Sequence, residues 1–431
     1  MMKYLFLILV ITTWQSAFGQ DISLLHLQGT MPGTFINPAL ILDKKINVSL
    51  AQIYLSLGTD GPSLNTLTSK NTSGQRYIDI KKLSGNLDSY HNVFFANDIR
   101  TLDVSIKAGG IAWMAGHGFR SSANVRYPRG LVELAAQGNA AFVGQTIQVG
   151  PTFDVLAYNE LYLGAQRTLG NFTLGVKAKL LYGTSSISTE RSDVLLTTKA
   201  DYYQLELKND YLIRSSALFR YSSLDSITVK YTGFTFDNLF YNNRGFALDI
   251  GASFKINKQI TISASALDIG SIKWDFFPRK YTSKGTFTFE GIDLAEYLGD
   301  TTFTGIKDTL LGIIKVKSQV EEYSTTLNST FTVAGTYDFS SSWSFNALYM
   351  LRNDYGYRNN ILSVSAVKKF KYIDAGLMYR LSKGNFTSLG IYGRLKVGPV
   401  SGYVSTDNII GLVKPFDNKS ATLRIGATIQ L

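Results

Sequence analysis

Residues Arg244 to Trp274 read RGFALDIGASFKINKQITISASALDIGSIKW, two long segments of alternating polarity joined by a short turn. On the first segment one face carries Phe246, Leu248 and Ile250, and the opposite face carries small or polar residues. This period of two predicts β-strands with one side toward water and the other toward lipid or a protein core. If the pattern recurs along an exported chain, it indicates a membrane-spanning β-barrel.

The same alternation recurs in segments near residues 102–108, 172–180 and 326–337. These segments hold 7, 9 and 12 residues, close to the 9 to 11 that a tilted membrane strand requires. A soluble β-sandwich shows the same period, but its strands are usually about 5 or 6 residues long. Strand length therefore favours an all-β fold with a single transmembrane antiparallel β-barrel. Trp113, Trp274 and Trp343 fall near predicted strand ends, where the aromatic girdles of such barrels lie.

Short and long connections alternate along the chain, as in outer-membrane barrels, whose periplasmic turns are short and whose external loops are long. Long connections are expected at about 58–97, 128–148, 186–243, 276–321, 352–359 and 409–419, with an external hairpin at 193–221. Fourteen membrane strands result, near 46–57, 98–108, 110–125, 152–168, 172–185, 244–256, 259–274, 322–338, 342–352, 360–370, 371–382, 385–397, 399–408 and 420–431. An even count places both chain ends in the periplasm. Strand boundaries can shift by several residues, so twelve and sixteen strands stay open.

The first nineteen residues have the features of a cleaved export signal. Lys3 precedes an apolar run at 4–13, and small residues precede an expected cut ahead of Gln20. This run is too short to span a bilayer as a helix, and the rest of the chain has no apolar run of roughly 20 residues. We therefore expect a signal peptide at 1–19 and a mature chain in the outer membrane of a Gram-negative bacterium.

The net charge of the chain is +11, but its 43 Lys and Arg residues are scattered singly rather than gathered in a run. This distribution argues against a nucleic-acid partner. The chain has no cysteine, which excludes a disulfide scaffold and thiolate chemistry.

Several basic side chains fall on the polar faces of predicted strands, where the lumen of a barrel would be: Lys107, Lys177, Lys179, Lys255 and Arg424. One interpretation is a lumen that prefers anions. The other is that these cations balance acidic groups in a polar interior, and the general pattern of barrels favours it.

Asp249 and Asp268 lie within the two strands of the hairpin, each among apolar neighbours. A carboxylate facing lipid would cost a few kcal/mol, so each is expected to face a wet lumen or to meet a cation such as Lys255 or Lys177. They are candidates for a pair that controls selectivity or gating. The alternative, a salt bridge that stabilises the wall, is favoured because polar interior networks are common in barrels.

The sequence has no recognisable catalytic or metal-binding motif. His26, His91 and His117 are far apart, and none has a metal-ligand spacing such as His-Glu-x-x-His. A Gly-x-Ser-x-Gly elbow and a phosphate-binding loop are also missing from the sequence. We therefore expect neither an enzyme nor a bound cofactor.

The segments GNAAFVGQTIQV (138–149), TLGVKAKLLYGTSSIST (173–189), the hairpin 244–274 and VSTDNIIGL (404–412) follow one another in this order. Together they resemble a Bacteroidota family of outer-membrane β-barrels whose function is unassigned. The resemblance spans nearly the whole mature chain. It implies a location, but no reaction and no catalytic residues.

Asn37, Pro38 and Ala39 precede the first predicted strand. They are similar to the Asn-Pro-Ala near the N-terminus of the long-chain fatty-acid transporter class, the FadL-like barrels of fourteen strands. In that class the segment before the first strand folds inward as a hatch. The resemblance implies that residues 20–43 form a lumenal plug and that residues 44–431 form the barrel. The same three residues would also suit an ordinary turn.

Two functions follow as expectations. The first is a FadL-like passive channel or porin that carries a small or hydrophobic solute, with outer-membrane lipid as its surroundings. The second is a non-catalytic accessory or scaffold subunit of an outer-membrane assembly or secretion complex, with protein partners docked on segments 193–221 and 276–321. In the latter segment Leu294, Leu298 and Leu310 are among apolar residues whose near-helical spacing would suit a docking face.

Overall fold

The computed structural model describes residues 22–79, 82, 87–201, 204–217, 219–223, 226–229, 236–289, 316–382, 385–414 and 416–431. The expected export signal at 1–19 and the near-helical apolar residues at 294–314 lie outside the described residues. No helix in the described part of the chain has the length and apolar character needed to cross a membrane.

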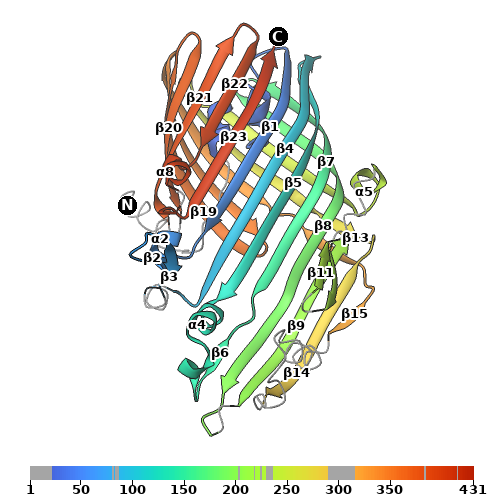
Figure 1. Cartoon of the computed structure of the whole chain (residues 1–431). Coiled ribbons are helices and arrows are strands. Elements are labelled where there is room, and N and C mark those ends of the chain that lie inside the picture. Colours follow the sequence, from blue (N-terminus) through green and yellow to red (C-terminus); the bar gives the residue numbers. More distant parts are fainter. Residues whose placement is uncertain are drawn as a thin grey trace, which may run out of the picture.

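Fourteen antiparallel strands form the wall of a closed barrel (Figure 1). They are β1 (Ile46–Thr59), β4 (Tyr90–Ala108), β5 (Ile111–Pro128), β7 (Thr152–Leu169), β8 (Phe172–Thr198), β12 (Arg244–Lys255), β13 (Ile260–Trp274), β17 (Thr330–Ser340) preceded by β16 (Tyr323–Thr326), β18 (Trp343–Asp354), β19 (Tyr357–Lys369), β20 (Ile373–Ser382), β21 (Asn385–Val397), β22 (Val400–Thr406) and β23 (Ser420–Gln430). Each pairs with the next, and β23 closes the barrel against β1. The predicted count and order of the membrane strands are confirmed.

The wall has an apolar outer face and a polar inner face. On β12, Phe246 and Ile250 are exposed on the outside, whereas Ala247 and Asp249 are buried inside. The outer face continues through Leu102, Ile106, Leu163, Val176, Phe331, Val333, Leu377 and Ile425. This arrangement is that of a barrel whose outer face meets lipid and whose inner face meets water or other polar groups.

The predicted aromatic girdle holds for two of the three tryptophans. Trp113 and Trp343 are exposed on the outer wall near the short turns. Trp274 is fully buried and donates from Nε1 to the hydroxyl of Thr325 at 3.1 Å, so its assignment to the girdle was wrong. Trp274 ends β13 beyond a bulge at Leu267 and Asp268, where the inner and outer positions of the strand exchange parity. The alternation that correctly places Ile262 and Ala264 outside therefore gives the wrong face for Trp274.

The short turns, the start of β1 and the end of β23 lie at one end of the barrel, at the top of Figure 1. The other end carries α2 (Leu64–Leu67), β2 (Thr68–Lys70), β3 (Arg76–Ile78), α4 (Arg129–Gln137), η3 (Asn139–Phe142), β6 (Thr146–Gln148), β9 (Leu205–Ala217), β10 (Phe219–Ser223), β11 (Ser226–Val229), α5 (Phe236–Phe240), β14 (Arg279–Phe289), β15 (Lys317–Gln319) and α8 (Ile409–Val413). The expected hairpin beyond the membrane forms where the outer part of β8 pairs with β9, which in turn pairs with β14.

One expected long connection is wrong. Instead of a loop over 352–359, β18 and β19 are joined by a tight turn at Tyr355 and Gly356, whose φ angles are 50° and 84°. Two positive φ angles are typical of the two-residue turns that join hairpins. Tyrosine rarely adopts this conformation, but the Tyr355 hydroxyl is held 2.6 Å from that of Ser122 inside the barrel.

Candidate functional site

The residues that precede β1 lie inside the barrel. This lumenal segment, Ile22–Leu42, contains the short 3₁₀ helices η1 (Ile22–Leu27) and η2 (Met31–Phe35). All its residues are buried except Gln28, Phe35 and Ile41, which are partly exposed. It folds back on itself through a bridge between Gly29 and Leu42 and forms no strand pairing with the wall. Its attachment therefore depends on side-chain contacts.

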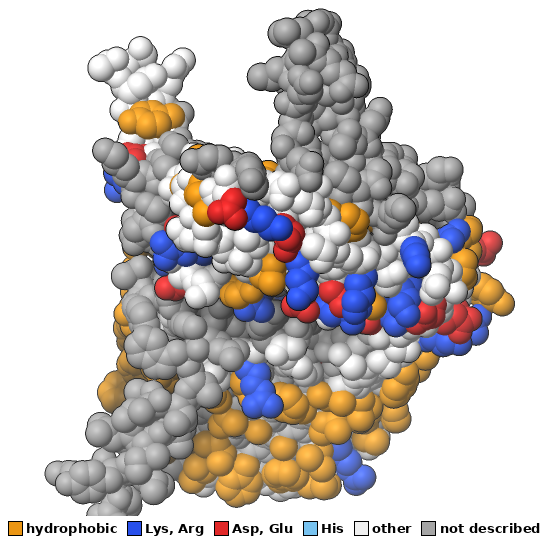
Figure 2. All heavy atoms as spheres, turned by 90° about the horizontal axis from the view of Figure 1, so that it is seen from below, with side chains coloured by type: hydrophobic (Ala, Val, Ile, Leu, Met, Phe, Trp, Pro, Cys, Tyr) orange, Lys and Arg blue, Asp and Glu red, His pale blue; other side chains and the backbone are white. Residues whose placement is uncertain are grey.

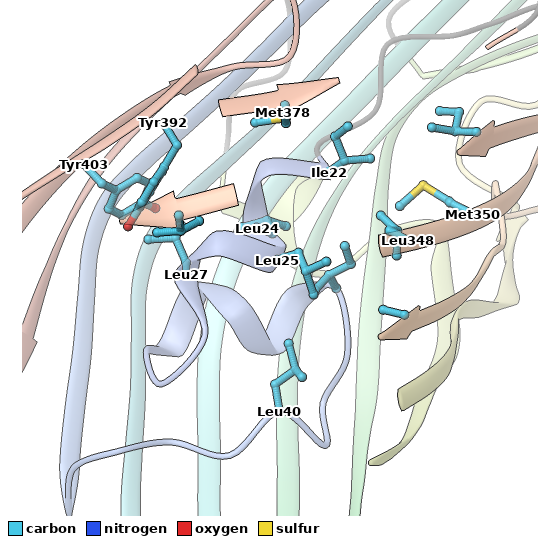
Figure 3. Packing of buried hydrophobic residues seen from close by; sticks show 14 residues of the cluster. Ile22, Leu24, Leu25, Leu27, Leu40, Leu348, Met350, Met378, Tyr392 and Tyr403 are labelled. Atoms are coloured by element: carbon cyan, nitrogen blue, oxygen red, sulfur yellow. The ribbon is translucent and has the colours of Figure 1, made fainter. Parts of the chain in front are cut away.

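One side of the lumenal segment is apolar and packs against an apolar part of the inner wall (Figure 3). Ile22, Leu24, Leu25, Leu27, Ile36 and Leu40 meet Ala334, Leu348, Met350, Ile361, Val367, Met378, Tyr392 and Tyr403 from β17 to β22. A fully buried Leu or Ile contributes roughly 1.5–3 kcal/mol. Since lumen-facing positions are usually polar, this apolar patch on the inner wall indicates that the wall is built to hold the segment.

The other side of the segment is held by polar side chains of the wall that donate to its main-chain carbonyl groups. Gln166 Nε2 donates to the oxygens of Pro38 and Leu40 at 2.8 and 2.7 Å. Ser265 Oγ donates to Ile36 at 2.7 Å, and Gln430 Nε2 donates to Gly29 at 2.8 Å. Buried carbonyl groups need such partners, and the wall supplies them where strand pairing does not.

Lys177 of β8 is fully buried against the segment. Its Nζ donates to the carbonyl oxygen and to the hydroxyl of Thr34, both at 2.9 Å. The same ammonium lies 4.1 Å from the centre of the Phe35 ring and 4.9 Å from that of Tyr162. Hydrogen bonds and cation–π contacts together offset part of the cost of burying this charge.

Asn37, Pro38 and Ala39 form a turn against β8, β12 and β13. Asn37 Nδ2 donates to the carbonyls of Ala252 and Ala264, and its Oδ1 accepts from the Ala39 N–H at 2.8 Å. The turn approaches the wall at two glycines. A Cβ on Gly251 would lie 2.0 Å from Asn37 Oδ1, and one on Gly175 would lie 2.1 Å from the Pro38 oxygen.

Beyond the segment, toward the long loops, eight buried or half-buried charged side chains form a chain of alternating sign on the inner wall. In order of contact this charge belt is Asp249, Lys179, Asp268, Arg120, Glu160, Arg100, Asp98 and Arg424. Lys179 Nζ lies 2.8 Å from Asp249 and 2.6 Å from Asp268. Arg120 lies 2.8 Å from Asp268. Four acids and four bases leave the belt without net charge, which favours balanced interior charges over an anion-preferring lumen.

A cavity of about 110 Å³ lies between the lumenal segment and the charge belt. Leu24, Phe35 and Ile36 line it from the segment. Arg120, Asp268 and other members of the belt line it from the wall, together with Leu156, Leu267 and Met350. The cavity therefore has an apolar floor and a mixed polar and apolar wall.

Two titratable groups that contact or belong to the segment have altered acidity. Burial lowers the pKa of His26 to about 4, because its ring packs 5.4 Å from that of Tyr392 away from water. Burial raises the pKa of Asp407 to about 7, although Arg380 at 3.8 Å and the N–H of Ile22 oppose this effect. The start of the segment therefore lies beside an acid whose ionisation is costly.

The structure places most of the predicted lumenal charges in the barrel interior. Lys177, Lys179, Asp249, Asp268 and Arg424 are buried there, and Lys107 donates to the carbonyl of Leu42. Lys255 is the exception, because it ends β12 at the short-turn end and its side chain is exposed. The cations that meet the two aspartates are Lys179 and Arg120, not Lys255 or Lys177.

Four members of the charge belt were not predicted from the sequence: Asp98, Arg100, Arg120 and Glu160. Each lies on the inner face of a long strand, but a bulge between Arg100 and Leu102 interrupts the alternation in β4. The signal that could have found them is the rarity of charge in membrane strands, since each such residue must meet a partner inside.

In the part of the chain that the structure describes, no three His, Asp or Glu side chains lie close enough together to hold a metal ion. His26, His91 and His117 belong to η1, β4 and β5, respectively.

The fold and its interior define a transmembrane β-barrel with a segment of its own chain held in the lumen. Within this class the chain belongs to a family of unknown function, DUF5723, whose model matches residues 38–407. This match confirms the resemblance to a barrel family without an assigned function. No curated protein matches the chain in sequence.

Solved structures with a similar fold include a TodX deltaS2S3 mutant, a monoaromatic hydrocarbon channel, at 9% identity with a TM-score of 0.45 over 93% of both chains. The Ralstonia pickettii toluene transporter TbuX is similar at 10% identity and 0.45 over 92% of both chains. A Pseudomonas aeruginosa FadL homologue matches at 10% identity and 0.38, over 97% of this chain and 100% of its own. The strand pairing described above, rather than this similarity, establishes the fourteen-stranded barrel.

Proposed function

We propose that this protein is a passive channel of the outer membrane that admits a small solute with an apolar part, and that the lumenal segment is its plug. The observation that carries the proposal is that Ile22–Leu42 occupies the lumen without belonging to the wall. The closed pairing of the fourteen strands does not depend on it. The segment can therefore move without opening the wall.

The cavity between the segment and the charge belt supports a small solute. Its volume of about 110 Å³ is somewhat below the roughly 150 Å³ of a protein cavity that binds benzene. Leu24, Leu267 and Met350 offer apolar contact, and the neighbouring charged groups are already paired with one another. An ion entering this space would compete with those pairs, whereas a neutral or amphipathic molecule would not.

Release of the plug needs no chemical energy source. The polar contacts that hold it are hydrogen bonds of roughly 1 kcal/mol net each, somewhat more where Lys177 donates, and its fully buried Leu and Ile side chains contribute roughly 1.5–3 kcal/mol each. Binding of the solute, rather than a chemical reaction, must offset these contacts. A solute that binds better to the displaced state than to the seated state would shift the equilibrium toward opening. Such a channel transports down a gradient and uses no cofactor.

A disulfide between the plug and the wall tests this proposal directly, because the chain has no cysteine of its own. The Oγ atoms of Ser23 in the plug and Ser405 in β22 are 2.7 Å apart, so Ser23→Cys and Ser405→Cys place two thiols in contact. The matched control joins two wall strands through Ser401→Cys and Thr428→Cys, whose hydroxyls are also 2.7 Å apart.

Both variants would be reconstituted in liposomes, and the entry of phenyl glucoside, whose sugar slows its passage through a bare bilayer and whose ring is apolar, would be measured under oxidising and reducing conditions. We expect oxidation to suppress its entry through the plug-locked variant, reduction to restore it, and the wall-locked control to respond to neither. Equal entry in both redox states of the plug-locked variant, above that of protein-free liposomes, would exclude this segment as the gate. Fractionation of cell membranes tests the location independently.

A further inference from the structure

The short-turn end of the barrel is strongly basic. This short-turn rim comprises residues 43–46, 107–111, 167–172, 255–260, 338–343, 368–374 and 394–400, which are the start of β1 and six of the turns with their flanking residues. It carries eleven Lys and Arg side chains and three Asp side chains, a net charge of +8. The whole chain has a net charge of +11, so most of its excess lies at one end of the barrel.

The long-loop end differs from the rim because basic side chains there form ion pairs with acidic ones. Arg191 lies 2.6 Å from Asp210, Lys280 lies 2.9 Å from Glu321, and Lys273 lies 2.8 Å from Glu322. Figure 2, which views the molecule from this end, shows basic and acidic side chains mingled beside the hydrophobic outer wall. Excess positive charge is therefore a property of the rim and not of the surface in general.

At the rim several cations lie beside aromatic rings where the apolar outer wall ends. Lys368 Nζ is 4.7 Å from the centre of the Trp343 ring and 5.7 Å from that of Phe370. Lys371 Nζ is 5.1 Å from the centre of the Tyr372 ring. Trp343, Phe370 and Tyr372 are exposed on this surface. Amphipathic aromatic rings occupy the headgroup level of a bilayer, so the neighbouring ammonium groups lie at the same level.

The acidic groups of the rim neutralise only part of its positive charge. Asp374 is shared by Arg394 and Lys396. Asp338 lies 4.0 Å from Lys369. Lys255 and Lys258 are exposed at the turn between β12 and β13, and Lys371 is exposed in the turn between β19 and β20.

We propose that the short-turn rim binds the anionic headgroups of phospholipids in the leaflet that surrounds it. Charge complementarity supports a lipid phosphate with a net negative charge, because juxtamembrane Lys and Arg residues attract anionic lipids individually. The distribution supports lipid over a single protein partner, since cations occur at the start of β1 and in five of the six rim turns rather than forming one patch. This inference rests on the transmembrane barrel and is independent of the proposed channel activity.

The exposed tryptophans supply a local probe, because Trp113 and Trp343 both lie at this end and Trp274 is buried inside. The full chain with Trp14→Phe, which leaves Trp113, Trp274 and Trp343, would be reconstituted in phosphatidylcholine containing either brominated phosphatidylglycerol or brominated phosphatidylcholine, and the quenching of tryptophan fluorescence compared. We expect a roughly three- to tenfold preference for the anionic lipid at low salt, falling toward unity in 1 M salt as the charges are screened.

The rim variant replaces Lys255, Lys258, Lys368, Lys369 and Lys371 by Gln. The matched control replaces five exposed lysines at the other end by Gln: Lys208, Lys273, Lys284, Lys317 and Lys414. We expect the rim variant to lose the preference and the control to keep it. Equal quenching by the two lipids in the native protein, or an unchanged preference in the rim variant, would overturn the proposal and direct attention to an acidic protein partner.

Discussion

The ammonium group of Lys177 lies 2.9 Å from both the carbonyl oxygen and the hydroxyl of Thr34, so a charge buried in the wall is stabilised by the main chain of the lumenal segment. Removing the charge should loosen the segment. In Lys177→Met we expect the amides of residues 22–42 to exchange faster with deuterium, equivalent to about 2 kcal/mol, because two charge-assisted hydrogen bonds are lost. Lys255→Met, at an exposed position of the neighbouring strand, is the control. Unchanged exchange in Lys177→Met would show that the apolar contacts alone hold the segment.

The close approach of the Asn37-Pro38-Ala39 turn to the wall predicts a steric effect. In Gly251→Ala the new methyl group would meet Asn37 Oδ1 at 2.0 Å, which no real contact allows. The turn should move away, and amide exchange at residues 37–39 should rise while the strands stay protected. Gly335→Ala on β17 is the control, because nothing lies within 4 Å of its Cβ position. Faster exchange in the control as well would point to a general weakening of the wall.

The charge belt should contribute to the stability of the barrel wall. Asp268 contacts Arg120 and Lys179, so Asp268→Asn leaves the buried Lys179 and the half-buried Arg120 with one partner fewer each. We expect unfolding in urea and detergent to become easier by about 3 kcal/mol, since breaking a buried ion pair leaves an uncompensated charge. Asn also tolerates the φ angle of 59° at this position, so backbone strain does not confuse the result.

The control for this prediction is Asp210→Asn, which removes a partly exposed acid from its pairs with the exposed Arg191 and Lys284 in the sheet beyond the membrane. Exposed pairs contribute little, so its unfolding should match that of the native protein. Equal stability of Asp268→Asn and the native protein would contradict a structural role for the belt.

Docking of the segment should depend on pH through His26. Its pKa is about 4 inside the barrel and near 6.5 in an exposed segment, because burial disfavours the charged ring. As the pH falls, His26 is protonated in the released segment at a higher pH than in the docked segment. The free energy of docking therefore becomes less favourable between about pH 6.5 and about pH 4, by on the order of 3 kcal/mol.

Amide exchange of residues 22–42, compared at each pH between the native protein and His26→Phe, measures this effect. Phenylalanine keeps a ring against Tyr392 and cannot be protonated, so the difference between the two proteins should appear below pH 6.5. Asp407, whose raised pKa acts in the opposite sense, is present in both and cancels. Parallel pH profiles would show that His26 does not control docking.

The alternation of outward-facing and inward-facing residues along each strand could be predicted from the sequence, because the surrounding lipid requires apolar side chains at the outward positions. Phe246 and Ile250 must face out and Asp249 must face in, whatever the register. The partners of Asp249 could not be predicted in the same way. Lys177 lies opposite Asp249 in the pairing of β8 with β12, yet its side chain extends to Thr34, and Lys179 takes the two carboxylates. Which cation pairs with Asp249 depends on the length of each side chain and on the packing of the lumenal segment. Neither can be inferred from an alternation with a period of two.

Two local features escaped the pattern for a physical reason. The bulge at Thr101 places both Arg100 and Asp103 on the inner face of β4. An alternation counted from residues before the bulge therefore assigns residues after it to the wrong face. The turn at Tyr355 needs a positive φ at a bulky residue, which composition alone does not suggest.

The contacts of the lumenal segment also set an order of assembly. Ser23 meets Ser405 across 382 residues of sequence, and Gln430 of the final strand meets Gly29 across 401. These contacts cannot form until the last strand has closed against β1, because before that moment the lumen does not exist. The lumenal segment is thus synthesised before the wall but is among the last parts of the chain to reach its native position. During insertion its leucines must be kept from water by some other apolar contact.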